Sequence, residues 1–358
     1  MKKIIAYGAA VLSAVLFFSS GLGSSPVFAD NSSSTKAEII EDISTISGSK
    51  EKNAVEKARK KVEAQKGDTR IIATSPAAIE ISNRMDIDLV GVTKSTTTEL
   101  PKRYANLPTV GTPMSPDVEA LASLSPDWIL SPQSLQSDLQ TKYEAIDTDW
   151  AFLNLNSVEG MYRSIYEMGQ IFAREEQASQ LIEEYAEFLE SYQKENKGKK
   201  KPKVMILMGL PGSYIIATEK SYVGSLVKMA GGENVYPDEE EAFLTINTED
   251  MKTKDPDIIL RAAHALPDQV IEMFDKDFEE NDIWKHFDAV KEGKVYDLTY
   301  ENFGMSANFN YQAALEELQP ELYAETDEEI AEAKENSQKA RSQAEESDAS
   351  ETYEEIQK

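Results

Sequence analysis

Two side chains able to coordinate a metal ion occupy well-defined positions in the chain. The 358 residues contain only two histidines, and His264 lies near the end of the apolar stretch 257–266, DIILRAAHAL. This stretch predicts a buried strand, with the histidine in the loop beyond its carboxyl end. Met114 lies in GTPMSPDVEAL, where Pro113 and Pro116 restrict the backbone on either side of it.

An imidazole nitrogen and a thioether sulfur form one of the axial ligand pairs that hold haem iron in proteins. Neither residue is informative alone, because a methionine commonly fills a core and a histidine commonly makes a hydrogen bond. The chain is expected to form two lobes, with Met114 in one and His264 in the other. As a pair, these two side chains would clamp a flat ligand from its two faces. The other histidine, His286, lies among charged residues in DIWKHFDAV and is interpreted as structural or exposed.

The N-terminal residues predict export. Met1-Lys2-Lys3 is basic, residues 4–18 are almost wholly apolar, and Val27 and Ala29 place small residues where a signal peptidase requires them. We expect a secretory signal peptide over residues 1–29, with an uncleaved signal anchor as the alternative. The protein is therefore expected outside the cytoplasm, at the cell surface or secreted.

The remaining chain alternates between strand and helix patterns. Residues 30–68, rich in Ser, Lys and Glu and with a charged helical patch at EKNAVEKARKKVEAQK, are interpreted as an N-terminal tether. Residues 69–156 and 199–325 each alternate short apolar runs with helical patterns, which predicts two α/β lobes with parallel sheets. The acidic residues 326–358 have little to bury and are expected to be disordered or loosely helical.

A long helix is expected between the two lobes, over residues 157–198. From Ser157 to about Lys194 apolar residues keep helical spacing, without proline and with only two glycines, Gly160 and Gly169. A continuous helix of this length would extend on the order of 55 Å, longer than one lobe is wide. The architecture is therefore two lobes joined by one helix, and ligands of such proteins bind in the cleft where strand ends of both lobes meet.

The two lobes also share an internal repeat. Glu119 stands seven positions before PDWIL, and Glu249 stands seven positions before PDIIL. Each glutamate lies early in a predicted helix that leads into a buried strand, which indicates a duplicated architecture.

The composition excludes several functions. The chain has no cysteine, so disulfides, thiolate metal sites and an acylated lipoprotein cysteine are excluded. A formal net charge of −27 argues against binding to nucleic acid or to anionic membranes. Two histidines are too few for a typical divalent-metal site. The motifs of serine hydrolases, zinc proteases and P-loop enzymes do not occur, so no enzymatic activity is expected.

Several longer stretches resemble a known class of proteins. They are LPKRYANLPTVGTPMSPDVEAL, ILMGLPGSYIIATEKSYVGSLVKMAGGENVY, DIILRAAHALP, NDIWKHF and VYDLTYENFGMSAN. Over residues 69–325 the chain is similar to the haem receptors of the iron-regulated surface determinant pathway in Gram-positive bacteria, which belong to the metal-chelate class with one inter-lobe helix. The resemblance implies a class III periplasmic-binding-protein-like fold, haem b as the ligand, and Met114 and His264 as its iron ligands.

Haem also requires partners for its propionates and porphyrin faces. The helix that begins at Thr74-Ser75-Pro76 offers free N–H groups and a positive dipole end, and Lys94 offers a charge. An ordinary helix cap and a solvated loop are the alternatives. Further pocket candidates lie in stretches that resemble the family, although each could equally belong to the core: Tyr214, Tyr222, Phe303 and Met305.

The resemblance further implies a transport partner. In this class one glutamate per lobe docks onto arginines of a membrane permease, so Glu119 and Glu249 are expected to bind an ABC permease dimer. Their alternative role is to stabilise the first turn of a helix. Receptors of this family are usually lipoproteins, and this chain has no cysteine to acylate, so its anchorage is open. Cell-wall haem donor proteins are a further expected partner.

Two other functions remain open from the sequence. A ferric-siderophore or cobalamin receptor would share the fold but would need no axial Met and His. A released haem scavenger, not coupled to a permease, would fit the missing lipid anchor.

Overall fold

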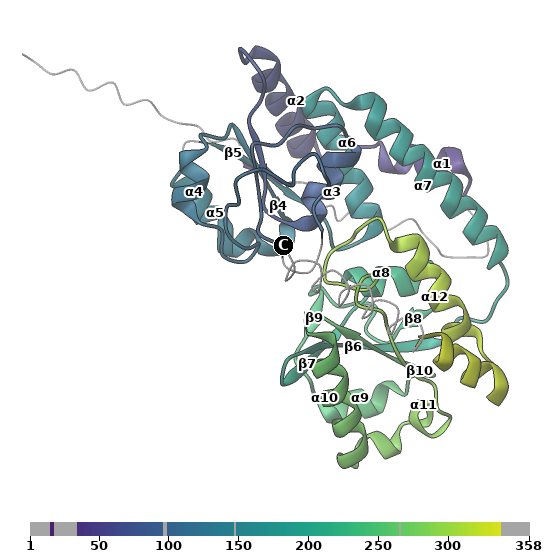
Figure 1. The fold of residues 1–358 in the computed structure, drawn as a ribbon. Coiled ribbons are helices and arrows are strands. Elements are labelled where there is room, and N and C mark those ends of the chain that lie inside the picture. The colour runs from purple at the N-terminus through teal and green to yellow at the C-terminus, as the bar shows by residue number, and fades with distance from the viewer. Residues whose placement is uncertain (1–14, 18–33, 96–98, 147, 265, 338–358) are drawn as a thin grey trace, which may run out of the picture. The chain divides into compact units, whose positions relative to one another are not determined.

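The computed structural model describes residues 15–17, 34–95, 99–146, 148–264 and 266–337. The chain forms two compact units, with residues 1–154 and 162–190 in unit 1 and residues 155–161 and 191–358 in unit 2. Each unit contains a largely parallel sheet covered by helices, as shown in Figure 1, so the predicted α/β fold class is confirmed.

The sheet of unit 1 has the strand order β1-β5-β4-β2-β3, and every neighbouring pair is parallel. Its strands β4 and β5 are buried along their whole length, because helices cover both faces of a parallel sheet. The strands are β1 (Val15–Phe17), β2 (Ile71–Ala73), β3 (Gly91–Val92), β4 (Trp128–Pro132) and β5 (Asp149–Leu153). A signal peptide over residues 1–29 was expected to lie outside the fold, whereas β1 pairs with β5 in this sheet. Cleavage of the signal stays a prediction.

In the described residues between β2 and β5, three helices and one short 3₁₀ turn connect the strands. They are α3 (Pro76–Arg84), α4 (Val118–Ser123), η1 (Gln133–Leu135) and α5 (Gln136–Glu144). Proline at the first position of α3 and the Ser75 cap begin that helix where the sequence predicted. Trp150 and Phe152 of β5 pack with Tyr143 of α5 in the core of this unit.

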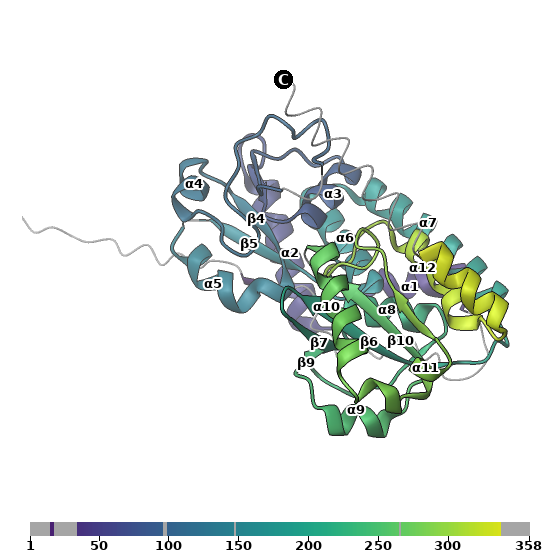
Figure 2. The ribbon, with the colours of Figure 1, turned by 60° about the horizontal axis from the view of Figure 1, so that its bottom comes forward.

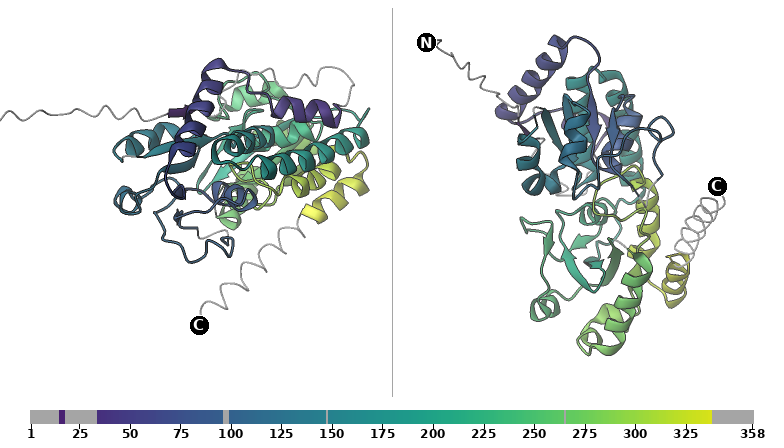
Figure 3. Two further views of the ribbon diagram at one scale, coloured as in Figure 1. Left: turned by 90° about the horizontal axis from the view of Figure 1, so that it is seen from above. Right: turned by 60° about the vertical axis from the view of Figure 1, so that its left-hand side comes forward.

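The segment expected to be a tether is folded. Residues Lys36–Ile43 form α1, which begins with a capping box at Thr35, and residues Ser49–Ala64 form α2. Ile39 and Ile43 are buried, and Asp42 of this segment forms an ion pair with Arg163 at 2.7 Å. Figure 3 shows these helices beside the rest of unit 1. The tether interpretation was wrong for residues 34–64 because α1 and α2 have apolar faces that pack against unit 1.

The long helix is interrupted. It consists of α6 (Val158–Phe172) and α7 (Glu175–Glu195), separated by Ala173, which has a left-handed φ of 53°. The Arg174 N–H donates to the Gly169 carbonyl at 2.9 Å, the bond that closes a Schellman motif. The prediction of one continuous helix was wrong. A left-handed break of this kind usually uses glycine, and because this one uses alanine, no glycine marks it in the sequence.

The sheet of unit 2 is mixed, which corrects the expectation of a purely parallel sheet. Its order is β11-β10-β6-β7-β9, with β8 also paired to β6. Strand β7 runs antiparallel to β6 and to β9, because Pro211-Gly212 closes a tight turn after β6. The strands are β6 (Lys203–Leu210), β7 (Ser213–Ala217), β8 (Glu233–Asn234), β9 (Phe243–Leu244), β10 (Ile258–Ala263) and β11 (Val295–Asp297).

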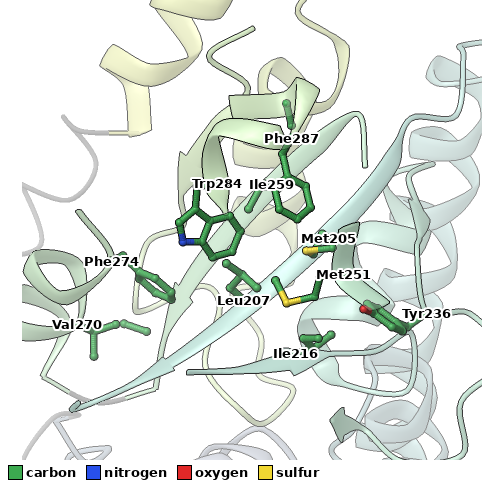
Figure 4. Packing of buried hydrophobic residues seen from close by; sticks show 12 residues of the cluster. Met205, Leu207, Ile216, Tyr236, Met251, Ile259, Val270, Phe274, Trp284 and Phe287 are labelled. Carbon is green, nitrogen blue, oxygen red and sulfur yellow. The ribbon is translucent and has the colours of Figure 1, made fainter. Parts of the chain in front are cut away.

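Helices cover both faces of this sheet (Figure 2). Alternate residues of β6 point to opposite faces: Met205 and Leu207 pack with α9–α11, whereas Val204 faces α8. Trp284, Phe274 and Phe287 complete the first of these layers (Figure 4). The helices are α8 (Tyr222–Met229), α9 (Thr248–Lys254), α10 (Pro267–Glu280), η2 (Trp284–His286), α11 (Asp288–Lys291) and α12 (Tyr311–Tyr323).

Part of the tail that was expected to be disordered or loosely helical forms a helix packed on unit 2. Residues 327–337 are helical, with Ile330, Ala333 and Ser337 buried. The Ser337 hydroxyl donates to the Asp297 carbonyl, which attaches this helix to β11. The expectation for residues 338–358 lies outside the described residues. No helix in the described ranges has the length and apolar character needed to span a membrane.

Candidate functional site

Met114 lies on a turn that is held at both ends. Gly111 forms an antiparallel bridge with Pro116, and the Ser115 N–H donates to the Thr112 carbonyl at 3.1 Å. Gly111 has a φ of +89°, and a Cβ there would lie 2.8 Å from the Asp117 nitrogen. Only glycine therefore fits this position, and the turn presents Met114 in a defined place.

The Met114 side chain is 69% exposed, which excludes core filling in this unit. The turn is attached to the carboxyl end of β3, since the Lys94 N–H donates to the Gly111 carbonyl at 2.7 Å and the Thr93 hydroxyl donates to the same oxygen at 3.1 Å. Lys94, with an exposed side chain, therefore begins at the same edge of the sheet as Met114.

The predicted anion site at α3 is largely occupied by the protein's own groups. The Ser75 hydroxyl caps the helix by accepting from the Ala78 N–H at 3.2 Å. Thr74 is fully buried, and its hydroxyl bonds the Leu130 carbonyl and the Ser131 hydroxyl. Pro76 has no N–H, and no described residue accepts the N–H of Ala77. The Ala77 amide is therefore the one N–H of this first turn that remains for a ligand. The ordinary cap is thus the better account of the Thr74 and Ser75 side chains.

His264 follows the last residue of β10, at the carboxyl edge of the sheet of unit 2. Its N–H donates to the carbonyl of Gly209 at 2.9 Å, which continues the pairing of β10 with β6. A side chain at Gly209 would collide with Val270 and Phe274 of α10, so glycine allows that helix to approach. The backbone of His264 is therefore fixed by the paired strands β10 and β6.

The imidazole of His264 is half-buried and makes no side-chain hydrogen bond or ion pair with any described residue. Burial lowers the pKa of His264 below its ordinary value, so the ring is neutral at neutral pH. A neutral imidazole with a free nitrogen is the form that coordinates iron.

Leu266 is a neighbour that the sequence interpretation did not consider. It has a left-handed φ of 47°, its side chain is 53% exposed, and it precedes Pro267 at the start of α10. The exposed apolar side chain lies two residues after His264. The only sequence signal was a leucine directly before a helix-starting proline.

The four pocket candidates of unit 2 separate into two groups. Phe303 is 0% exposed and Tyr222 is 1% exposed, so the core alternative holds for both. Tyr214 is half-buried, and its hydroxyl donates to Asp277 at 2.9 Å. Met305 is half-buried in the loop before α12 and stays a candidate. Stretches that resemble a family do not by themselves distinguish core from surface.

The internal repeat around Glu119 and Glu249 is also present in the hydrogen bonds that begin α4 and α9. Asp117 caps α4 by accepting from the N–H groups of Glu119 and Ala120. Asn247 caps α9 in the same way, accepting from Glu249 and Asp250. Glu119 and Glu249 are each the second residue of an exposed first turn. His286, the other histidine, is exposed in η2, as expected.

Comparisons with known proteins extend this description. The chain is 42% identical over 258 residues to the high-affinity heme uptake system protein IsdE of Staphylococcus aureus (strain Newman), covering 72% of this chain and 88% of that protein. It is similar to the crystal structure of S. aureus IsdE complexed with heme, with a TM-score of 0.68, 41% identity and coverage of 72% and 100%.

A crystal structure of an ABC transporter substrate-binding protein from Listeria monocytogenes EGD-e has a TM-score of 0.69, 44% identity and the same coverage of 72% and 100%. These similarities confirm the resemblance inferred from the sequence motifs. The periplasmic binding protein family matches residues 71–301, which is more than half of the chain. The chain therefore belongs to the periplasmic binding protein family, whose members are substrate-binding transport proteins rather than enzymes.

Proposed function

We propose that this protein is an exported, extracytoplasmic haem-binding protein that delivers haem b to an ABC permease for iron acquisition. Two relatives above 40% identity support this proposal, one named a heme uptake protein and solved with heme, the other named an ABC transporter substrate-binding protein. Cell-wall haem donor proteins are the proposed source of the ligand.

The proposed iron ligands are His264 of unit 2 and Met114 of unit 1. The observation that carries this assignment is the exposure of Met114, 69%, on a turn whose backbone is fixed by hydrogen bonds. Exposing a thioether that could be buried has a cost, and coordination of a soft iron would offset it. His264 contributes a neutral ring without a competing partner among the described residues.

The propionates are proposed to interact with the ammonium of Lys94 and with the Ala77 N–H at the start of α3. Lys94 begins at the sheet edge that holds the Met114 turn, and no described residue forms an ion pair with it. Because the chain carries a net charge of −27, a dianionic ligand needs such a local positive charge. Tyr214 and Met305 are the remaining proposed wall residues.

Delivery is proposed to use Glu119 and Glu249. Both carboxylates are exposed, and each occupies the same position in a helix of the same design. This duplication supports docking onto a permease dimer, because two equivalent subunits offer two equivalent receptor sites.

A hemin titration of the purified protein tests the proposal. We expect a sharp Soret band and the visible bands of low-spin iron, both altered in the His264→Ala variant. His286→Ala is the matched control, because it removes the other histidine from an exposed position. The broad spectrum of free hemin throughout the titration would reject haem and favour another metal chelate. A haem complex without permease-dependent uptake would identify a released scavenger.

A further inference from the structure

The segment KENKGKKKPK, residues 194–203, is a concentrated positive charge on a very acidic protein. It contains six lysines and one glutamate in a chain with a net charge of −27. The segment connects α7 to β6 (Figure 1) and belongs to unit 2. The proposed haem site does not use it.

The backbone of this segment is held in place. Lys197 and Lys199 donate N–H groups to the carbonyls of Lys194 and Asn196, and Gly198 adopts a φ of +85° between them. Pro202 is buried, and its carbonyl accepts from the Glu233 N–H at 2.8 Å. The Lys199 ammonium bonds Gln319 at 2.8 Å and lies over the Tyr323 ring. The lysines are thus displayed on a defined turn.

Most of these ammonium groups have no partner in the part of the chain that the structure describes. Lys197, Lys200, Lys201 and Lys203 are exposed, and none forms an ion pair or side-chain hydrogen bond with a residue in the described ranges. Half of the six cations of α2 differ, since Arg59, Lys60 and Lys61 each form an ion pair with an acid. The charge of the segment is therefore available to an external anion.

The fold itself does not require these lysines. The Lys203 N–H donates to Asp257 at 2.8 Å where β6 begins, and the Arg70 N–H donates to Asp127 at 2.7 Å where β2 begins. The chain before β2 reads QKGDTR, with one lysine and one aspartate, and the Arg70 guanidinium bonds the Leu124 and Ser125 carbonyls. The same hydrogen bond is thus made at the start of β2 in unit 1 by a segment with little net charge.

From these observations we propose that residues 197–203 bind a linear polymer whose negative charges are spaced phosphates. Clustered ammonium groups bind phosphates with release of counterions. Aromatic residues and arginines, which would stack on bases, do not occur in this segment. A flat anionic membrane would also face the acidic remainder of the surface, whereas a thin polymer interacts within a screening length of about 8 Å.

The location of the segment leaves the proposed ligand site accessible. Lys203 begins β6, and His264 follows the opposite end of the neighbouring parallel strand β10. Six residues of strand separate the two edges by about 20 Å. A polymer bound at Lys197–Lys203 would hold the protein without covering His264.

Binding of the full chain to immobilised poly(glycerol phosphate) tests this inference. We expect binding at 50 mM salt that weakens steeply as salt rises. The variant Lys197→Gln, Lys200→Gln, Lys201→Gln, Lys203→Gln should bind at least tenfold more weakly, and the slope of log affinity against log salt should fall by about three. Thermal melting of this variant should match that of the original protein.

The matched control is Lys52→Gln, Lys57→Gln, Lys60→Gln, Lys66→Gln, which removes the same charge from the α2 region and should change affinity less than threefold. The inference is overturned if the original protein does not bind, if the loop variant binds equally well, or if the control loses as much. Equal or tighter binding to phosphatidylglycerol vesicles or to single-stranded DNA would overturn the assignment to a phosphate polymer without bases. Because no haem is involved, failure here leaves the haem proposal untouched.

Discussion

The helix–strand pair α4–β4 in unit 1 and the pair α9–β10 in unit 2 are built alike. Each helix is capped by a side chain that accepts two N–H groups, and each is followed by a left-handed residue, Ser125 or Asp255. Each then continues through Pro-Asp, whose carboxylate accepts an N–H where the neighbouring strand begins, from Arg70 before β2 or from Lys203 of β6. The repeat therefore includes its hydrogen bonds as well as its residue spacing.

The proposed iron ligands do not follow this repeat. Met114 precedes the cap of α4, and the corresponding residue of unit 2 is Leu244 in β9. His264 follows β10, and the corresponding residue of unit 1 is Ser134 in η1. The repeat therefore covers the helix–strand scaffold and the two equivalent glutamates, but not the two proposed ligands.

The largest expected effect concerns the equivalent glutamates. Combined replacement Glu119→Ala, Glu249→Ala should reduce haem uptake by cells to background, because both carboxylates proposed to dock onto the permease are lost. Hemin binding by the purified double variant should be unchanged, as measured by the Soret titration. Loss of both properties together would show that the glutamates serve the fold, and the two equivalent docking points would be rejected.

The non-equivalent ligands should differ in strength. His264→Ala should weaken hemin retention on the order of 100-fold or more, because even outer-shell changes at metal sites cost 10–100-fold. Met114→Ala should have a smaller effect, since the thioether lies on an exposed turn and the imidazole is half-buried on a fixed backbone. Transfer of hemin to apomyoglobin measures retention. An equal loss in both variants would contradict this ranking.

The buried acids of the two units give a pH test. Burial, with Glu51 adding to it, raises the pKa of Glu167 to about 9, and burial raises the pKa of Glu321 well above its ordinary value. The folded state therefore keeps protons that the unfolded chain releases above pH 4.5, so these groups reduce stability as pH rises. Glu167→Gln should stabilise unit 1 by roughly 1–3 kcal/mol at pH 8 and have no effect at pH 4.

Glu321→Gln should produce the same pH-dependent gain in unit 2, and the exposed Glu272→Gln is the control. Urea unfolding at both pH values measures these differences. A gain that is equal at pH 4 and pH 8 would contradict proton uptake as its cause.

The smallest expected effect separates the two Pro-Asp carboxylates. Asp127 accepts from Arg70 and from Gln65, whereas the more exposed Asp257 accepts from Lys203. Asp127→Ala should cost about 2 kcal/mol of unfolding free energy and Asp257→Ala about 1 kcal/mol. Equal costs in urea unfolding would show that the additional bond from Gln65 contributes nothing.

Predictions from local patterns succeeded where a few neighbouring residues decide the structure. The cap of α3, the strands β4, β6 and β10, and the repeat around Glu119 and Glu249 agree with the structure. Predictions failed where packing between segments distant in the chain decides the structure. The helical patch of the tether was predicted, but its packing was not. Ile39 and Ile43 are buried against a partner surface that composition does not reveal.

The chain's residues by themselves determined its α/β class, the absence of thiol chemistry, the duplicated helix–strand pair and the identity of two candidate iron ligands. These properties follow from residue types and short-range periodicity. Tertiary structure alone decided that Met114 is exposed, that Phe303 and Tyr222 are interior, and that Thr74 and Ser75 use their hydroxyls within the protein. Burial and hydrogen-bond partners depend on segments far apart in the chain, so no local pattern contains them.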